Sequence, residues 1–503
     1  MAEESLQNNF FDTEYLKADL KGRSVRGGAI TIAAQWTRFC FQMASMIVLA
    51  RLLTPQDFGL IAMVMVVTGF VTRFKDMGLS LATVQRAEIN HAQISTLFWI
   101  NLLLSFGLML IAAALAPAIT WFYGEPRLAL ITIALASGIF FGGLTIQHQA
   151  LLRRQMRFGI LAAIDIVSIS IGIFAAIIAA WYGAGYWSLV IMQLSAAVTH
   201  AVAAWFACGW RPGLPVRGSG VRKMLAFGGY LTGYDLVNYF ARNGDNLLIG
   251  KFWGAGQLGL YSKAYALLML PIQQITTPVA AVAIPALSRL QNEPERYRTY
   301  YYRAISMIAF ITMPLVAMLA ALSDEVIVIV LGGQWAGASP IFKVLAFAAF
   351  FQPLVSTTVC VYVSLGQTKR MMYWGAIAVP IILLSFVVGL SWGALGVAIS
   401  YTTCFLTIIM VPSLAFAFRY SPIRVVDFFR ALSYPAIVAT AIYCVTGIIR
   451  FCLGETRSGW ILAWCCVAAG GIYIGSILCS RKVRGELMSL LAILKMSKKS
   501  PEF

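Results

Sequence analysis

Charged residues, and acidic ones above all, are scarce in this chain of 503 residues. Only 12% of the residues are Asp, Glu, Lys or Arg, whereas 60% are hydrophobic, and Asp and Glu together number 20. A soluble globular domain usually has about 25% charged residues. The scarcity excludes an ordinary soluble protein and indicates a chain that lies in a lipid bilayer.

Residues that bind metals or form disulfides are also few and scattered. The three histidines, His91, His148 and His200, are far apart in the sequence and form no ligand cluster with carboxylates or thiols. The nine cysteines lie in or beside apolar segments without C-x-x-C spacing, where they usually pack as small hydrophobic residues. We therefore expect no metal site, and no cofactor beyond a coupling ion.

Nucleotide-binding motifs are missing as well. The sequence has no Walker A motif, so we expect no ATP hydrolysis. Gly254, Gly256 and Gly259 fit G-x-G-x-x-G, but no strand precedes them, and we interpret this segment as an outer loop between two membrane helices. The prolines of the following segment, Pro271, Pro278 and Pro285, are interpreted either as hinges or as packing kinks.

Long apolar segments are present throughout the chain. A bilayer core needs about 20 helical residues to cross, and fourteen such windows predict an all-α polytopic membrane protein. The windows are 28–50, 57–80, 94–116, 128–150, 159–181, 185–208, 225–250, 257–286, 304–322, 339–364, 373–391, 394–418, 431–450 and 459–480. Residues 1–27 lack the basic and apolar pattern of a signal peptide and are expected to form a cytoplasmic arm.

Basic residues alternate in density between successive loops. With the N-terminus placed in the cytoplasm, 27 of the 38 basic residues fall in inner segments and 5 in outer ones. This is the positive-inside pattern, with both termini cytoplasmic, and it explains the net charge of +18 by topology and contact with anionic lipid. We expect no nucleic-acid partner.

An internal repeat organises the chain. Residues 28–60 align without a gap with residues 228–260, so that Arg51 matches Lys251, and Gly183-Ala184 matches Gly393-Ala394 at an offset of 210. The repeat predicts two pseudo-symmetric, parallel six-helix lobes, an arrangement that transporters use to bind substrate between lobes and rock about it. The expected domains are the lobes 28–208 and 225–418, the basic linker 209–224, two further helices in 419–480 and a basic tail 481–503.

The first helix of each lobe has a polar stripe. Gln35, Arg38, Gln42 and Ser45 share one helical face, and an equivalent stripe occurs at the same offset of 200. The second stripe contains Asp235, Asn238, Arg242 and Asp245. Charged residues inside a membrane usually face a cavity or a partner, and the stripes could instead form an ion-pair network that only holds helices together.

Positive charges outnumber negative ones around the stripes. We count five bases, Arg38, Arg73, Lys75, Arg242 and Lys263, against three acids, Asp76, Asp235 and Asp245. This surplus predicts that an anion binds there. Arg38 and Arg242 lie deepest, whereas Arg73, Lys75 and Asp76 lie near a helix end and could reach the interface, and Arg51 lies at an outer end.

Two segments resemble a known family. RLLTPQDFGLIAMVMVVTGFVTRFKDMGLSLATVQR (Arg51 to Arg86) and LGLYSKAYALLMLPIQQITTPVAAVAIPALSRLQ (Leu258 to Gln291) are similar to signature segments of Wzx-type polysaccharide transporters of the multidrug/oligosaccharidyl-lipid/polysaccharide exporter superfamily. The resemblance implies a flippase of the bacterial inner membrane that moves undecaprenyl-diphosphate-linked oligosaccharides for exopolysaccharide or O-antigen-type synthesis. It also implies a polysaccharide polymerase and a chain-length regulator as partners.

The resemblance further implies site residues and a coupling ion. Related lipid II flippases have a cationic central cavity, whose matching positions here are Arg51, Arg73, Lys75 and Lys263. Coupling to H⁺ or Na⁺ occurs in the superfamily, and the carboxylates of Asp235 and Asp245 are the candidates.

Two other functions remain open. A drug/cation antiporter of the same superfamily would need a neutral or acidic cavity, whereas the predicted cavity is cationic. A membrane glycosyltransferase or polymerase would need acidic catalytic motifs and a large outer loop. The longest outer segment, about 323–338, contains only Asp324 and Glu325 as acidic residues.

Overall fold

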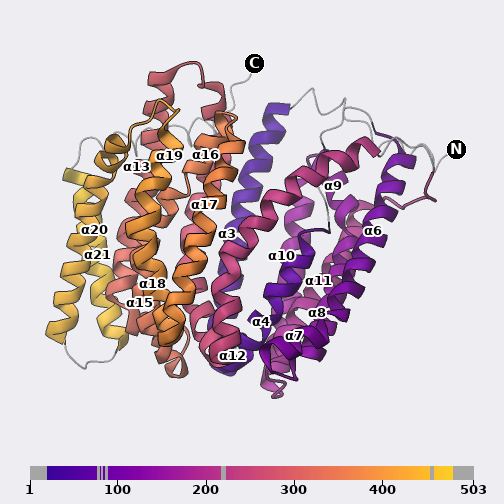
Figure 1. Ribbon diagram of the computed structural model, residues 1–503, viewed down its shortest axis with the longest axis horizontal. Coiled ribbons are helices and arrows are strands. Elements are labelled where there is room, and N and C mark those ends of the chain that lie inside the picture. Colours follow the sequence, from indigo (N-terminus) through magenta and orange to yellow (C-terminus); the bar gives the residue numbers. More distant parts are fainter. Residues whose placement is uncertain are drawn as a thin grey trace. The chain divides into compact units, whose positions relative to one another are not determined.

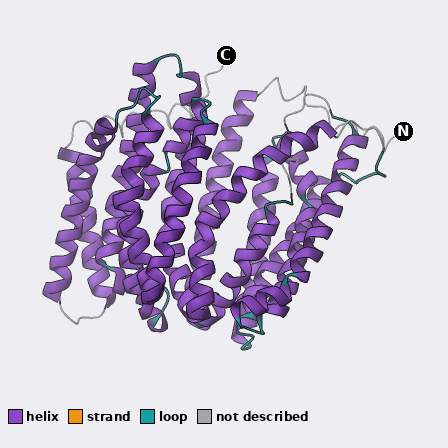
Figure 2. Cartoon of the chain, in the orientation of Figure 1, coloured by secondary structure: helices purple, strands orange, loops and turns teal. Residues whose placement is uncertain are grey.

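The computed structural model describes residues 20–75, 80, 83–84, 89–216, 222–453 and 458–479. Within these ranges the regular structure is helical and includes no strand (Figures 1 and 2). Eleven helical segments of the described part are long and apolar enough to cross a membrane. The predicted fold class, an all-α polytopic membrane protein, is therefore confirmed.

The number of fourteen spans stays a prediction. One of the eleven segments, Thr368–Phe418, contains both predicted windows 373–391 and 394–418. These windows are joined without a loop, because the helix of Thr368–Gly389 leads through the 3₁₀ turn η2 (Leu390–Trp392) directly into the next helix. The turn at Gly393 has φ +73°, which only a residue without a β-carbon adopts readily.

The chain forms two compact units, Met1–Gly259 and Leu260–Phe503. The lobe and linker boundaries predicted above are not tested by this division. The helices of the first unit are α3 (Leu20–Leu52), α4 (Pro55–Thr72), α6 (His91–Ala114), α7 (Ala116–Tyr123), α8 (Leu128–Gly143), α9 (Ile146–Arg154), α10 (Phe158–Trp181), α11 (Trp187–Cys208) and the first part of α12 (Arg222–Arg289).

In the first unit, α10 packs on α3 and α11, and α8 packs on α4, α6 and α11. Lipid tails are as apolar as leucine, so membrane helices associate through close packing rather than through the hydrophobic effect. Gly172 of α10 allows such packing, because a β-carbon there would lie 2.8 Å from the carbonyl oxygen of Met192 and 3.0 Å from the β-carbon of Ala196 in α11.

The start of the predicted linker is anchored to the first unit. Trp210 is fully buried, and its ring lies 5.2 Å from that of His148 and 5.9 Å from that of His91. The next residues hydrogen-bond to α6, where Gly213 N–H donates to Ser95 Oγ (2.9 Å) and Gly213 O accepts from Trp99 Nε1 (2.9 Å). The rings of His91 and His148, which are distant in the sequence, thus both lie beside the ring of Trp210.

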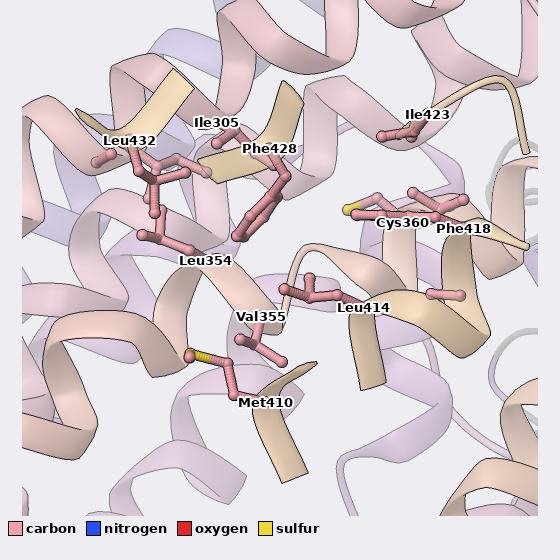
Figure 3. Packing of buried hydrophobic residues seen from close by; sticks show 14 of the residues in the cluster. Ile305, Leu354, Val355, Cys360, Met410, Leu414, Phe418, Ile423, Phe428 and Leu432 are labelled. Atoms are coloured by element: carbon pink, nitrogen blue, oxygen red, sulfur yellow. The ribbon is translucent and has the colours of Figure 1, made fainter. Parts of the chain in front are cut away.

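The second unit contains the rest of α12 and the remaining helices. These are α13 (Pro294–Ala321), α14 (Ser323–Val330), η1 (Gly333–Ala338), α15 (Ser339–Val355), α16 (Thr358–Ser364), α17 (Thr368–Gly389), η2, α18 (Gly393–Cys404), the π-helical η3 (Phe405–Ile409), α19 (Met410–Phe418), α20 (Val425–Leu453) and α21 (Ser458–Cys479). Their core joins α13, α15, α16, α19 and α20 (Figure 3). The two C-terminal helices α20 and α21 pack on each other, and α20 packs along α13.

The glycine-rich segment joins two helices, as expected, but by a kink and not by a loop. The two helices meet at Gly254, which has φ 75° and ψ −179°, and residues 255–259 are helical. The backbone at Pro271, Pro278 and Pro285 stays helical, so the break in α12 is at Gly254. The positive φ of Gly254 is one that a residue without a β-carbon adopts readily.

Candidate functional site

Arg38 lies in the middle of α3 and is bound by an acid from another helix. Its Nη1 is 3.1 Å from Oδ2 of Asp165 in α10. The other carboxylate oxygen, Oδ1, is 3.3 Å from Nε2 of His200 in α11. The three side chains are 37%, 36% and 22% exposed, so this Arg38–Asp165–His200 cluster is accessible from outside the packed helices.

Asp165 was not among the three acids counted around the polar stripes, yet it pairs with Arg38. His200 also approaches this carboxylate, although no group of three potential metal ligands occurs among the described residues. A signal was available in the sequence, because Asp165 is the single charged residue of its apolar window 159–181 and His200 is the single histidine of the window 185–208. An ionisable residue inside a span usually marks a functional site or a partner.

The other residues of the first polar stripe differ in how far their side chains are buried. Ser45 is buried, and its hydroxyl contacts Sδ of Met192 in α11 at 3.9 Å. Gln35 is half-buried and Gln42 is exposed. The stripe thus turns Arg38 and Ser45 toward α10 and α11, while Gln42 stays accessible for a polar ligand.

Arg73 and Lys75 pack near the end of α4 rather than pointing freely away. The guanidinium of Arg73 lies 5.6 Å from the ring centre of Tyr239 in α12. The hydroxyl of Tyr239 donates to the carbonyl oxygen of Val66 (2.7 Å) and lies 3.2 Å from that of Met65. Nζ of Lys75 lies close to Gly142 of α8, since a β-carbon on that glycine would be 2.5 Å away.

The second stripe is only partly described. Arg242 is exposed on α12, whereas Asp245 is buried and accepts a hydrogen bond from the backbone N–H of Asn246 (2.8 Å). Asp76 and the side chains of Asp235 and Asn238 lie outside the described residues. Arg38 and Arg242, which occur on the two equivalent helices, are therefore both accessible.

Arg51 does not join Arg38. The two are 13 residues apart on the continuous helix α3, which separates them by about 20 Å along its axis. Lys251, the repeat partner of Arg51, donates to the carbonyl oxygen of Phe122 at the end of α7. The structure thus places these two matched bases at helix ends.

The second unit contains Lys263 and a separate cavity. Lys263 is half-buried on α12. The cavity of about 250 Å³ lies between α12, α13, α15 and α16, and its hydroxyl-bearing lining was not predicted. The lining includes Thr276, Thr277, Tyr301, Ser356 and Thr357.

Asp324 and Glu325, the two acids of segment 323–338, form ion pairs inside the second unit. Arg450 of α20 binds Asp324, and its Nε is 2.8 Å from Glu325 Oε1. Burial opposes ionisation of the Asp324 carboxyl, but hydrogen bonds from Ser339 and Arg450 outweigh it and lower its pKa. Both acids are thus engaged in holding α14, α15 and α20 together, which is not how a free catalytic acid would be held.

No group of three potential metal ligands occurs among the described residues. The eight cysteines whose side chains are described are free thiols.

Solved structures of exporters share this fold. The chain is similar to the lipid II flippase MurJ in an inward closed conformation, with a TM-score of 0.71 and 16% identity over 89% of this chain and 97% of that one. It is also similar to an inward-facing multidrug transporter of the MATE family, with a TM-score of 0.59, 16% identity and coverage of 80% and 94%. The chain therefore has the fold of these two transporters.

The chain belongs to the polysaccharide biosynthesis protein family, whose pattern matches residues 48–340. Relatives include the teichuronic acid biosynthesis protein TuaB of Bacillus subtilis, 29% identical over 61% of this chain and 64% of that protein. The lipopolysaccharide biosynthesis protein WzxC of Escherichia coli is 25% identical over 65% of this chain and 67% of its own length. The match thus spans about two thirds of each of these relatives.

Proposed function

We propose that this protein is a flippase that moves undecaprenyl-diphosphate-linked oligosaccharide repeat units across the bacterial inner membrane. The observation that carries the proposal is Arg38, a permanent cation in the middle of α3 whose side chain is 37% exposed. A diphosphate brings about two negative charges into a region where a lone anion is very unfavourable. A guanidinium stays charged and donates in a planar fork that matches phosphate oxygens.

The family of the chain and its relatives support a lipid-linked oligosaccharide as the substrate class. The family is named for polysaccharide biosynthesis, and a relative in Rhizobium meliloti, 24% identical over 67% of this chain, is a succinoglycan biosynthesis transport protein. The fold is shared with a lipid II flippase. The proposed product pathway is therefore synthesis of an exopolysaccharide or an O-antigen-type polymer, with a polymerase and a chain-length regulator acting next.

The proposed mechanism is alternating access with both termini in the cytoplasm. Arg38 and Arg242 lie on helices that the repeat makes equivalent, so an anion could be held by both during crossing. Lys263, Arg73 and Lys75 are the next candidates to contact the anion or sugar. A drug/cation antiporter is less well supported, because exposed guanidinium groups disfavour a cationic substrate.

The first prediction separates anion binding from helix pairing. Arg38→Ala and Arg242→Ala should each reduce polymer export strongly and cause lipid-linked precursor to accumulate on the cytoplasmic leaflet. Arg→Lys should restore only part of the export, because the fork is lost. Arg296→Ala removes an exposed arginine that pairs with Glu293 one turn away, and serves as the matched control.

The double variant Arg38→Ala/Asp165→Asn decides between the two roles of Arg38. Removing both partners of a purely structural ion pair is often nearly neutral. Wild-type export by the double variant, with normal levels in the membrane, would show that Arg38 only holds α3 against α10. Continued loss of export is expected.

A further inference from the structure

Asp165 binds one nitrogen of the guanidinium that the proposed substrate needs. Its Oδ2 binds Arg38 and its Oδ1 binds His200, so a single carboxylate is shared between a permanent cation and a titratable ring. Histidine changes charge near neutral pH more readily than any other side chain. An incoming phosphate and Asp165 compete for the same guanidinium.

We propose that the Arg38–Asp165–His200 cluster is a proton-binding exchange site, in which a diphosphate displaces Asp165 from Arg38 and the Asp165–His200 pair takes up a proton. The proposal rests on the proposed function and names residues for its coupling. It replaces Asp235 and Asp245 as the first candidates for that role.

The charge balance explains the direction of the exchange. When Arg38 turns to the phosphate, Asp165 loses its cationic partner and His200 loses a nearby positive charge. Both changes favour protonation of the pair by a proton from water, and the bound anion favours it further. Because coupling between two binding events is reciprocal, protonation must also strengthen anion binding. Affinity for the diphosphate therefore rises as pH falls.

Few other ionisable groups surround the cluster. The helices that pack on α10 and α11 are α3, α4, α8 and α9, and α8 has no ionisable residue. Asp165 is the single carboxylate of α10 and α11 together. The remaining charged or titratable groups with described side chains on these elements and their caps are Arg26, Cys40, Arg51, Asp57, Arg73, Arg127, His148, Arg153, Arg154, Arg157, Tyr182, Tyr186 and Cys208.

Apart from Cys40, an exposed thiol on α3, these groups are engaged elsewhere or lie toward helix ends. Asp57 belongs to the capping box of Thr54 at the start of α4. His148 stacks on Trp205 at 4.7 Å, and Arg154 donates to the carbonyl oxygen of Thr83. Arg157 is eight residues before Asp165, or about 12 Å along α10. The exchange is therefore confined to Arg38, Asp165 and His200.

The test counts protons taken up when a diphosphate binds. Full-length protein in nanodiscs is titrated with geranylgeranyl diphosphate by calorimetry at pH 7, in two buffers that differ in ionisation enthalpy. Inorganic diphosphate is the second ligand and shows whether the lipid is needed for binding. The proton count of Asp165→Asn, in which Arg38 no longer has this carboxylate as a partner, corrects for protons bound by the ligand itself.

Wild type should take up more protons per ligand than Asp165→Asn, by up to about one. His200→Gln keeps Arg38 and Asp165 and should also lower the uptake, so the test does not depend on one variant folding. Asp165→Asn should bind the ligand more tightly than wild type. Glu125→Gln removes an acid that pairs with Arg127 outside the cluster and should leave the uptake unchanged.

Two contrary results are distinguishable. Wild type that binds a diphosphate but takes up no more protons than Asp165→Asn and His200→Gln would overturn the exchange and leave the proposed function standing. Wild type that binds neither ligand would overturn the anion site itself, and the exchange with it.

Discussion

At the scale of single residues, Tyr239 joins α4 to the first part of α12. Its ring is buried under the Arg73 guanidinium, and its hydroxyl reaches backbone carbonyls of α4. Gly69 makes the contact possible, because a β-carbon there would lie 2.5 Å from the tyrosine hydroxyl. A carbonyl of a helix can accept this second hydrogen bond in addition to the one within its own helix.

Tyr239→Phe should lower the free energy of unfolding by about 1 kcal/mol, because it removes one buried hydrogen bond and keeps the ring under Arg73. Thermal unfolding in detergent measures the change. Tyr239→Ala should lower stability further, since it also removes the packing and the cation–π contact. Tyr182→Phe is the control, because that side chain is 86% exposed. Equal unfolding temperatures for Tyr239→Phe and wild type would contradict the assigned hydrogen bond.

At the scale of helices, an ion-pair clamp joins α20 to the short helix α14. Arg450 binds Asp324 and Glu325, and Ser339 at the start of α15 also binds Asp324. Glu325 is 7% exposed in its side chain, so its charge must be paired where it lies. The clamp connects one of the two additional C-terminal helices to the rest of the second unit.

The clamp makes stability depend on pH in the acidic range. The pKa of Asp324 is lower in the folded protein, so its ionised form stabilises the fold above the unfolded-state pKa of about 4. This stabilisation is lost as pH falls through the folded-state pKa. Asp324→Asn should reduce the unfolding temperature at pH 7 and flatten its decrease between pH 5 and pH 3. Glu293→Gln, which breaks an exposed pair, should leave that slope unchanged.

At the scale of the whole molecule, membrane topology is predicted from charge alone. The 27 to 5 distribution of basic residues places the linker 209–224 inside and the turn after α10 outside. Leu214 in the linker is 83% exposed and Tyr182 at that turn is 86% exposed, so cysteines at both sites can be labelled.

In a variant lacking the nine native cysteines, Leu214→Cys should react with a membrane-impermeant maleimide only after cells are opened. Tyr182→Cys should react in intact cells once the reagent has passed the outer envelope. Polymer export by the cysteine-less variant checks that the fold is kept. Labelling of both positions from the same side would contradict the predicted topology.

The sequence allowed prediction of the helical membrane fold and the equivalence of its repeats. Hydropathy reports each span locally, and the repeat at Gly183 and Gly393 is matched by positive φ values of 79° and 73°. The partner of Arg38 was missed, because Asp165 is 127 residues away and only helix packing brings the two together. The kink at Gly254 was mistaken for a loop, because a glycine-rich segment can form either.

The reciprocal crossing of α4 and α12 has a consequence for the origin of the chain. A β-carbon on Gly59 would lie 1.7 Å from the carbonyl oxygen of Ala255, and one on Gly259 would lie 1.8 Å from that of Pro55. Gly59 therefore contacts the residue four positions before Gly259, and Gly259 contacts the residue four positions before Gly59. A two-fold symmetric homodimer has this reciprocal contact pattern. An ancestor of half the length would have made this contact between two separate copies, and gene fusion would have turned it into the present internal one.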